Sequence, residues 1–441
     1  MQRIIIKNFG PIPFCDLEIN DFMIFIGQQS TGKSTICKCI HFFKSVRDEV
    51  ISNLYSVLDN GIIDNNSIKT IRKKINENFV HLFGQTKFKK DFYIRFEYCN
   101  GIFIETTIAK DTDEYLNFNF SETLQNKINE LKDIVINDFK SMKRSTNSDD
   151  LFVRLEKNKA FTIIKFELNK LFDDDKEIFY IPAGRGLLSL LTNNYLGIDL
   201  ELLDSISGNF MKLVQKVRIN FEKPFNDSPD LTLFDAVLET NDFKDSKMKS
   251  MWESSKKIKS EILEGEYLYD NGSEFIKLKN GDLIPVNYAS SGQQEVLWIL
   301  NLLQLWMLRS GDKNIFLVIE EPEAHLFPDT QKRVVQFISK FANNNNNQVL
   351  ITTHSPYILT SINNLLYAEK VGKKKPKEVR QIIPQNSWLD IGKTAAYLVG
   401  GSKEYLSDII DKESSLISAE QIDTVSNIIN SEYEKIYNLE D

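Results

Sequence analysis

A continuous apolar run, a glycine-rich segment and an amphipathic stretch follow one another near the start of the chain. The run is Phe22–Ile26, and the segment Gly27–Ser34 comes directly after it. From Ser34 to about Leu58 the apolar positions recur at nearly 3.6 residues, the spacing of a helix that packs one face on a sheet. Two further strand-like segments, Ile4–Phe9 and Asp16–Ile19, precede these elements. The pattern therefore predicts three strands, a glycine-rich loop and a long helix.

The middle of the chain alternates between strand-like and helix-like patterns. Residues 91–98 and 101–109 predict a hairpin closed by Asn100-Gly101, because this dipeptide favours a two-residue hairpin turn. Residues 121–171 and 187–263 are charged and helical in pattern, and residues 176–185 predict a strand that runs into a loop.

The last third reads as a β meander followed by alternating helices and strands. Residues 265–288 contain Asn-Gly pairs at 271–272 and 280–281, which predict tight turns. Predicted helices at 293–308 and 330–342 alternate with predicted strands at 314–319 and 348–352, and a polar helical tail follows. The five asparagines at 343–347 predict a solvated loop. This alternation favours an α/β fold with a mixed or parallel central sheet.

Composition narrows the class of protein. The chain has 441 residues, of which 42% are hydrophobic and 26% charged, the proportions of a soluble globular protein. No apolar run is long enough for a transmembrane helix, so we expect no membrane association. Four cysteines without paired spacing predict buried thiols in the cytoplasm. The net charge of −8 disfavours nucleic-acid binding through bulk charge. The basic stretches Lys87–Lys90 and Lys373–Lys377 are local candidates for phosphate contacts, with solvated loops as the alternative.

The glycine-rich segment fits the phosphate-binding pattern G-x-x-x-x-G-K-S/T. Its setting between a buried strand and a helix is the one that the chemistry needs, because backbone N–H groups and the helix N-terminus then face the phosphates. We expect Lys33 to reach the β- and γ-phosphates of ATP and Ser34 to ligate Mg²⁺. A glycine-rich turn without nucleotide is the alternative. The predicted nucleotide-binding residues are Gly27, Gln28, Ser30, Thr31, Gly32, Lys33, Ser34 and Thr35.

Two glutamates follow the apolar run Ile315–Ile319. The carboxyl ends of buried strands are where α/β sheets bind ligands. We expect Glu320 to hold Mg²⁺ and Glu321 to polarise the water that attacks ATP. A solvated acidic strand end is the alternative.

Three further segments resemble motifs of the ABC-type AAA-family ATPases, in the RecF-, OLD- and SMC-like group. Ala289–Gln293 resembles the signature motif, Glu320–Pro328 the Walker B motif and D-loop, and Thr352–Pro356 the switch-histidine loop. The resemblance covers about residues 1–120 and 265–370. It implies an ATPase in which two subunits enclose the nucleotide, so that the chain assembles with itself.

Carried over residue by residue, the resemblance assigns the remaining site residues. The signature residues Ser290, Ser291, Gly292 and Gln293 would contact the γ-phosphate bound to a second copy. His354 would contact the γ-phosphate in its own chain, whereas a histidine alone is more often structural. The usual Walker B aspartate is Glu320 here. Tyr180-Ile181-Pro182 resembles the strand end before the Q-loop, where Ala183 stands in place of the glutamine. Either another side chain takes the sensing role, with Arg185 as the candidate, or this segment is not the Q-loop.

The resemblance also implies a fold and a division of the chain. We expect an ABC-type P-loop ATPase head with an antiparallel β subdomain and a helical insert. Its parts would be an N-terminal ATPase lobe at 1–120, a mainly helical insert at 121–264 with a strand near 177–182, a C-terminal ATPase lobe at 265–370, and a polar helical tail at 371–441. No sustained heptad pattern predicts a long coiled-coil arm.

Three functions are candidates for this ATPase. The chain resembles the stand-alone ATPase subunits of the Septu or PARIS anti-phage systems, which implies a separately encoded nuclease or toxin as partner. A RecF-like ATPase of DNA repair or chromosome maintenance is the second candidate, and a scaffold that binds ATP without useful turnover is the third. No cluster of acids typical of a nuclease follows His354, so we expect no nuclease activity in this chain.

Overall fold

The structure, a computed structural model, is built of two compact units that interleave along the chain. Unit 1 comprises Met1–Ile19 and Ser30–Ile178, and unit 2 comprises Asn20–Gln29 and Phe179–Asp441. The structure describes residues 1–60, 67–84, 91–108, 116–144, 150–191, 203–222, 246–308, 314–401, 404–411, 413–414, 416–418 and 424–437.

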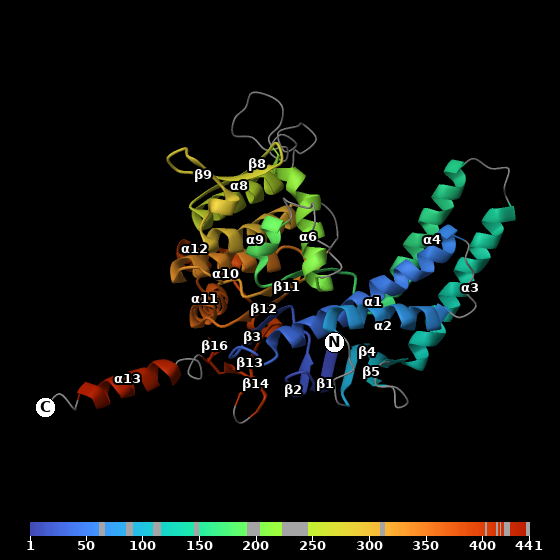
Figure 1. Ribbon diagram of the computed structural model, residues 1–441, viewed down its shortest axis with the longest axis horizontal. Helices are drawn as coiled ribbons and strands as arrows, with labels where there is room; N and C mark the ends of the chain where they lie inside the picture. The colour runs from blue at the N-terminus through green and yellow to red at the C-terminus, as the bar shows by residue number, and fades with distance from the viewer. Residues whose placement is uncertain are drawn as a thin grey trace. The chain divides into compact units, whose positions relative to one another are not determined.

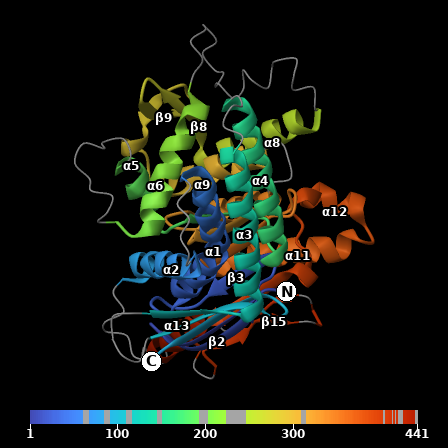
Figure 2. The same ribbon diagram turned by 90° about the vertical axis from the view of Figure 1, so that its right-hand side faces the viewer.

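Unit 1 is an antiparallel sheet with helices. Its strands run in the order β2-β1-β4-β5-β6, and the predicted hairpin at Asn100-Gly101 is the β4–β5 connection. The strands are β1 (Arg3–Phe9), β2 (Ile12–Glu18), β4 (Tyr93–Cys99), β5 (Ile102–Ile108) and β6 (Leu116–Phe120), and the helices are α1 (Lys33–Asn60), α2 (Ser67–Phe83), α3 (Glu122–Arg144) and α4 (Asp150–Leu171). Helices α3 and α4 lie side by side as a short helical hairpin (Figures 1 and 2).

Aromatic packing joins the sheet of unit 1 to helices α1 and α2. The ring of Phe79 on α2 lies 5.7 Å from that of Phe9 and 5.8 Å from that of Phe118, both on the sheet. Phe42 on α1 lies 5.1 Å from Phe79 in an edge-to-face arrangement. Such pairs stabilise a core beyond the area they bury, so the helix that follows the glycine-rich loop is firmly held.

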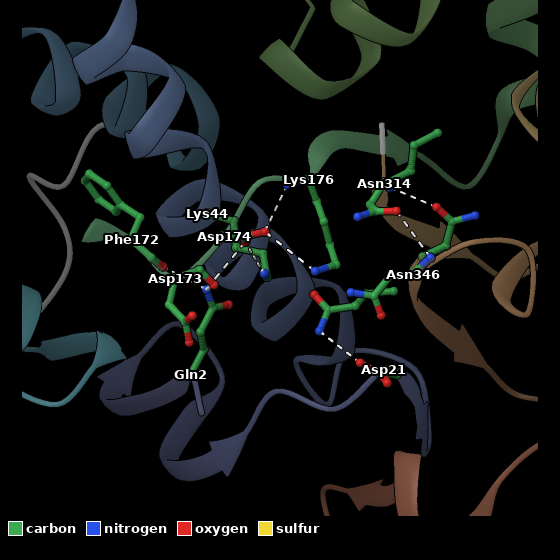
Figure 3. A network of polar contacts seen from close by, with 12 residues as sticks. Gln2, Asp21, Lys44, Phe172, Asp173, Asp174, Lys176, Asn314 and Asn346 are labelled. Carbon is green, nitrogen blue, oxygen red and sulfur yellow. Dashed lines mark hydrogen bonds and ion pairs between the residues drawn. The ribbon is translucent and has the colours of Figure 1, made fainter. Parts of the chain in front are cut away.

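A buried ion-pair network ties the segment after α4 to helix α1. Lys44 Nζ lies 2.6 Å from Asp174 Oδ2, and their side chains are 1% and 5% exposed. Gln2 donates to the same carboxylate, and the backbone N–H of Lys176 donates to its other oxygen (Figure 3). Arg47 donates to the backbone carbonyl of Asp174. A buried charge is tolerated only when it is paired and hydrogen-bonded, which this arrangement achieves.

Unit 2 contains a six-stranded mixed sheet in the order β14-β13-β3-β12-β11-β7 and a three-stranded antiparallel sheet. Strands β13, β3, β12 and β11 are parallel neighbours, while β14 is antiparallel. The strands are β3 (Phe22–Ile26), β7 (Glu177–Ile181), β8 (Gly265–Asp270), β9 (Ser273–Leu278), β10 (Leu283–Pro285), β11 (Ile315–Glu320), β12 (Gln348–Thr353), β13 (Thr394–Val399), β14 (Leu406–Asp408), β15 (Ile410–Asp411) and β16 (Leu416–Ile417). The helices are α5 (Arg185–Leu191), α6 (Ser205–Arg218), α8 (Ser246–Leu263), α9 (Ser291–Met307), α10 (Pro328–Ala342), α11 (Pro356–Gly372), α12 (Pro376–Ile382) and α13 (Thr424–Tyr437).

The predicted fold class, α/β with a mixed central sheet and an antiparallel β subdomain, is confirmed. Every residue of β3 and β11 is buried, as expected for central parallel strands with both faces covered. Helix α9 is buried along almost its whole length and packs against α8 and α10 (Figure 1). The β8–β9 turn has positive φ at Asn271 (47°) and Gly272 (80°), which is the left-handed backbone that this type of hairpin turn needs.

The prediction of a polar helical tail at 371–441 is wrong in part, because this range holds strands β13 to β16 as well as helices α12 and α13. Strand β13 pairs in parallel with β3, so that this segment contributes a strand to the central sheet. Its sequence, TAAYLV, contains two alanines, which favour helices and are poor strand formers. Packing beside β3 overrides this propensity, and both Ala395 and Ala396 are buried.

The prediction of a solvated asparagine loop at 343–347 is also wrong in part. Asn347 is buried, and its amide donates to the carbonyls of Phe341 (2.9 Å) and Asn344 (2.7 Å) while accepting from Ile315 N (2.9 Å). Asn343 donates to the carbonyl of Trp388 at 2.6 Å. The asparagines therefore end α10 and lead the chain into β12 by satisfying backbone groups.

Replacing Asn347 by alanine should destabilise unit 2 by about 1–3 kcal/mol, because Ile315 N and two carbonyls would lose their partners in a buried place. Urea unfolding followed by fluorescence measures this change. Asn346→Ala is the matched control, since that side chain is exposed and should change the midpoint little. Equal effects of the two substitutions would contradict the assigned role of Asn347.

All four cysteines are free thiols. Cys15, Cys37 and Cys39 are buried, and Cys99 is half-buried. Burial raises the pKa of the Cys15 thiol to about 12, so this thiol is unreactive at neutral pH. Within the described residues, no helix combines the length and the apolar character needed to cross a membrane.

Candidate functional site

The carboxyl ends of three neighbouring strands of the mixed sheet carry the candidate residues of unit 2. Glu320 ends β11 and lies opposite Thr352 of β12, and Thr353 of β12 lies opposite Ile26 of β3. Because these strands are parallel, Gly27 after β3, Glu321 after β11 and His354 after β12 leave the sheet at the same edge. The structure thus gathers one end of the glycine-rich segment, the acidic pair and the predicted switch histidine.

Glu320 is buried, and neighbouring groups orient its carboxylate. It is 6% exposed; Tyr180 Oη donates to Oε1 at 2.7 Å and the backbone N–H of Ala183 donates to Oε2 at 3.0 Å. Tyr180 comes from β7, the strand on the outer side of β11. The tyrosine and the following loop thus fix the Glu320 carboxylate from the side of β7.

Glu321 has an unusual backbone conformation. Its φ is +41°, the left-handed region that costs a non-glycine residue roughly 1–2 kcal/mol. Its N–H donates to the carbonyl of Thr352 at 2.9 Å, and its carboxylate Oε1 lies 3.3 Å from His354 Nε2. Strained backbone of this kind persists where the surroundings hold it, often at active sites. The two residues that the sequence predicted to be catalytic are therefore in direct contact, and both side chains are partly exposed.

Glu323 orders the loop of the switch histidine, a role that the sequence analysis missed. Its Oε1 accepts from Thr353 Oγ1 at 2.6 Å and from His354 N at 2.7 Å. Its Oε2 is buried and has no hydrogen-bond partner among the described residues. The signal in the sequence was the third acid of Glu-Glu-Pro-Glu, which lies two residues beyond the acidic pair.

Arg185 is buried and hydrogen-bonded to four backbone carbonyls. Its guanidinium donates to the carbonyls of Glu295 (2.7 Å), Glu320 (2.7 Å), Glu321 (2.9 Å) and Pro182 (3.1 Å), and the residue is 1% exposed. Burial lowers the pKa of Arg185, while the nearby glutamates oppose that shift. The structure thus shows backbone partners for Arg185, and the nucleotide-sensing role stays a prediction.

The predicted signature residues form the N-terminal turn of α9. Ser290 is the N-cap: its Oγ accepts from Gln293 N at 3.3 Å, and Gln293 Oε1 accepts from Ser290 N at 3.1 Å, which is a capping box. Ser290 and Ser291 are exposed, whereas Gly292 is buried. A Cβ on Gly292 would lie 2.7 Å from the carbonyl oxygen of His325, so this position requires glycine. Capping explains Ser290 and Gln293 locally and leaves both serines open to a ligand.

The rest of the glycine-rich segment belongs to unit 1. Gly32 has φ +99°, a conformation that favours glycine, and α1 begins at Lys33 directly after it. Lys33 is buried, Ser34 is exposed and Thr35 is half-buried in the first turn of that helix. A helix N-terminus preceded by such a turn fits phosphate, because free N–H groups and the helix dipole favour an anion.

A serine hydroxyl and a carboxylate such as Glu320 fit Mg²⁺, which keeps several waters and takes one or two protein ligands. In the described part of the chain, no three acidic, histidine or cysteine side chains form a ready-made metal site.

The structure describes one of the two basic stretches that the sequence offers for phosphate contacts. Lys373–Lys377 spans the connection after α11 and the start of α12, its lysines are exposed, and Lys373 Nζ lies 2.7 Å from Glu369 Oε1. The other, Lys87–Lys90, lies outside the residues that the structure describes.

Comparison with known proteins assigns the chain to a family. Similar solved structures at low identity include an SMC head bound to the C-winged helix domain of ScpA, with a TM-score of 0.37 and 11% identity over 81% of this chain and 90% of that chain. An SMC head domain from Thermotoga maritima has a TM-score of 0.34 and 12% identity over 81% of this chain and 90% of that chain. An SMC head with an extended coiled coil, bound to the C-terminal domain of ScpA derived from Pyrococcus furiosus, has a TM-score of 0.34 and 13% identity over 82% of this chain and 92% of that chain. No curated protein matches the sequence. The family described as AAA ATPase domain matches residues 1–359. This match covers most of the sequence and confirms the predicted enzyme class, so the chain belongs to the AAA ATPase domain family and is an ATPase.

Proposed function

We propose that the chain binds ATP and Mg²⁺ through the glycine-rich segment and hydrolyses ATP with Glu321 as the general base. The observation that carries this proposal is the contact between Glu321 and His354 at the edge of the sheet where β3 leads into Gly27. A carboxylate in reach of a water can take its proton as that water attacks the γ-phosphate.

The remaining residues receive roles from their chemistry. The backbone N–H groups of Gly27–Gly32 bind the phosphates, and Lys33 neutralises the β- and γ-phosphate charge. Ser34 and Glu320 hold Mg²⁺, which when bound neutralises charge on the phosphate oxygens. Tyr180 and Ala183 N orient the Glu320 carboxylate for that task, and His354 contacts the γ-phosphate.

We further propose that two copies of the chain complete the site. Ser290 and Ser291 are exposed at the N-terminus of the 17-residue helix α9, where N–H groups and the helix dipole favour an anion. In this proposal Ser290, Ser291, Gly292 and Gln293 face the γ-phosphate bound to the other copy.

Replacing Ser290 by arginine should leave ATP affinity unchanged and abolish the part of hydrolysis that rises with protein concentration. The reason is that the long cation would stand where the second copy approaches, while the chain's own phosphate loop is untouched. Measuring turnover and molar mass with ATP over a range of protein concentrations tests this. Asn280→Arg is the matched control, since it adds the same charge at an exposed turn of the β meander. Concentration-dependent turnover that survives in Ser290→Arg would refute the shared site.

For the biological role we propose a cytoplasmic subunit of an anti-phage complex that controls a separately encoded nuclease or toxin. The resemblance to Septu- and PARIS-type ATPase subunits supports this role. Co-purification with the product of the neighbouring gene, and protection of cells against phage by the gene pair, are the expected results. A chain that binds no such product and protects no cells would refute it.

A RecF-like DNA-binding role is the second candidate, and the exposed lysines of 373–377 are the observation that favours it. Phosphate contacts predict DNA affinity that falls steeply with salt. ATP-dependent DNA binding that is lost when these lysines are replaced by serine would favour this candidate over the first.

A further inference from the structure

Arg185 joins three chain segments that lie far apart in the sequence. It is the first residue of α5, and its guanidinium donates to the loop after β7, to α9 and to the end of β11. Its partners on α9 and β11 are 110 and 135 residues away in the sequence. These bonds use four of its five N–H groups on backbone carbonyls, which is possible because the guanidinium is planar and rigid.

On the side of β11, Arg185 acts on the backbone of Glu321. Nη1 donates to the carbonyl of Glu320 and Nη2 to the carbonyl of Glu321. Glu321 has the left-handed φ of +41°, and its own N–H is held by Thr352. The carbonyl of the strained residue is thus fixed by Arg185 and its N–H by the neighbouring strand, so that its carboxylate is directed at His354.

On the side of α9, the first residues of α5 are hydrogen-bonded to the helix that begins with the predicted signature residues. Nε of Arg185 donates to the carbonyl of Glu295, and the N–H of Gly186 donates to Glu295 Oε1 at 3.2 Å. Glu295 Oε2 lies 3.7 Å from Arg185 Nε. Glu295 lies three residues after Gly292, within the first turns of α9. A shift of that helix end would therefore move the guanidinium and, through it, Glu321.

We propose that Arg185 is a positioning residue that couples the N-terminal turns of α9 to the carboxylate of Glu321. The proposal rests on the proposed function, in which a nucleotide bound to a second copy contacts α9 and Glu321 acts on water. Contact at Ser290 then sets the position of the base, so that hydrolysis depends on a completed site.

The test uses the full chain with Arg185→Lys. Lysine keeps the positive charge, but its single ammonium cannot reach four carbonyls. Misplacement of a catalytic group by about 1 Å is expected to lower turnover by roughly 100-fold, with ATP affinity unchanged. Arg47→Lys is the matched control, because Arg47 is also buried and donates to two backbone carbonyls, those of Asp174 and Lys176. It should lower stability without a specific loss of turnover.

A second variant guards against a folding defect in Arg185→Lys. Gly186→Ala keeps Arg185, and its added Cβ would lie 2.9 Å from Glu295 Oε1, which displaces this carboxylate oxygen from its hydrogen bond with the N–H of residue 186. It should lower turnover in the same way, though less, again without loss of ATP affinity. Turnover equal to wild type in both variants overturns the proposal.

Hydrogen exchange without nucleotide separates this proposal from the proposed function. In Arg185→Lys, peptides that contain Glu321–Leu326 and peptides that contain Ser291–Leu297 should lose protection together, and Arg47→Lys should leave both unchanged. If the wild-type chain hydrolyses no ATP but both peptides lose protection together in Arg185→Lys, the proposed roles of the site residues are refuted and the coupling is retained. Loss confined to one peptide, or absent from both, would refute the coupling itself.

Discussion

Replacing Glu321 by glutamine should lower the turnover of ATP by roughly 10²–10⁴-fold, the range expected when a positioned general base is removed. Glutamine keeps the size of the side chain and can still contact His354, which lies 3.3 Å from Oε1. It cannot accept a proton from water. ATP affinity should persist because the phosphate-binding residues are unchanged, and ATP-bound assemblies should accumulate. Single-turnover hydrolysis and equilibrium ATP binding measure the two quantities separately.

Two controls define this experiment. Lys33→Ala should abolish nucleotide binding, since it removes the cation that the phosphate loop directs at the β- and γ-phosphates. Asp329→Asn changes an acid to its amide at an exposed position in the first turn of α10 and should leave turnover unchanged. If Glu321→Gln hydrolyses ATP at the wild-type rate, Glu321 is not the base.

Much of the sheet edge around Glu321 could be predicted from the sequence. Each of β3, β11 and β12 contains a short apolar run, which leads into Gly27, Glu320 and Thr352 respectively, and parallel strands of this kind place those ends together. The strand β11 and its acidic pair were therefore predictable from local pattern alone. So was the helix that begins at Lys33, because a glycine-rich turn precedes a regular apolar spacing.

The contacts that hold the edge together could not be predicted in this way. Arg185 and Glu320 are 135 residues apart, and Thr353 and Glu323 are 30 apart. No periodicity links residues at such distances, and only the folded sheet brings them into hydrogen-bond range. The left-handed backbone of Glu321 was equally hidden, because glutamate has no preference for that conformation. Strand β13 was missed for a related reason: its alanines favour a helix, and pairing with β3 decides otherwise.

The buried ion pair of unit 1 could not be predicted from the sequence either, and its loss is expected to have the second large effect, on stability. Asp174 follows α4 in an Asp-Asp-Asp run that reads as an ordinary solvated loop. In the fold its carboxylate is buried 2.6 Å from Lys44 Nζ, 130 residues away. Burial raises the pKa of Asp174, but Lys44, Lys176 and Arg47 outweigh this effect and hold the pKa below its ordinary value.

Replacing Asp174 by alanine should destabilise unit 1 by about 3–5 kcal/mol, because Lys44 would keep a buried charge without its partner. The pair Lys44→Met with Asp174→Leu should recover much of that loss, since two apolar side chains remove both charges. Asp16→Ala breaks an exposed pair with Arg3 and should shift the urea midpoint little. If Asp174→Ala and Asp16→Ala have equal effects, the buried pair does not hold the segment to α1.

The pH dependence of stability gives an independent measure of the same pair. Since the folded pKa of Asp174 lies below its unfolded value, its contribution is present above about pH 4 and is lost as the pH falls through the folded pKa. The difference in unfolding free energy between wild type and Asp174→Ala should therefore be constant from pH 5 to about pH 7 and shrink in stronger acid. A difference that stays constant down to about pH 2 would show that the carboxylate charge of Asp174 does not stabilise the fold.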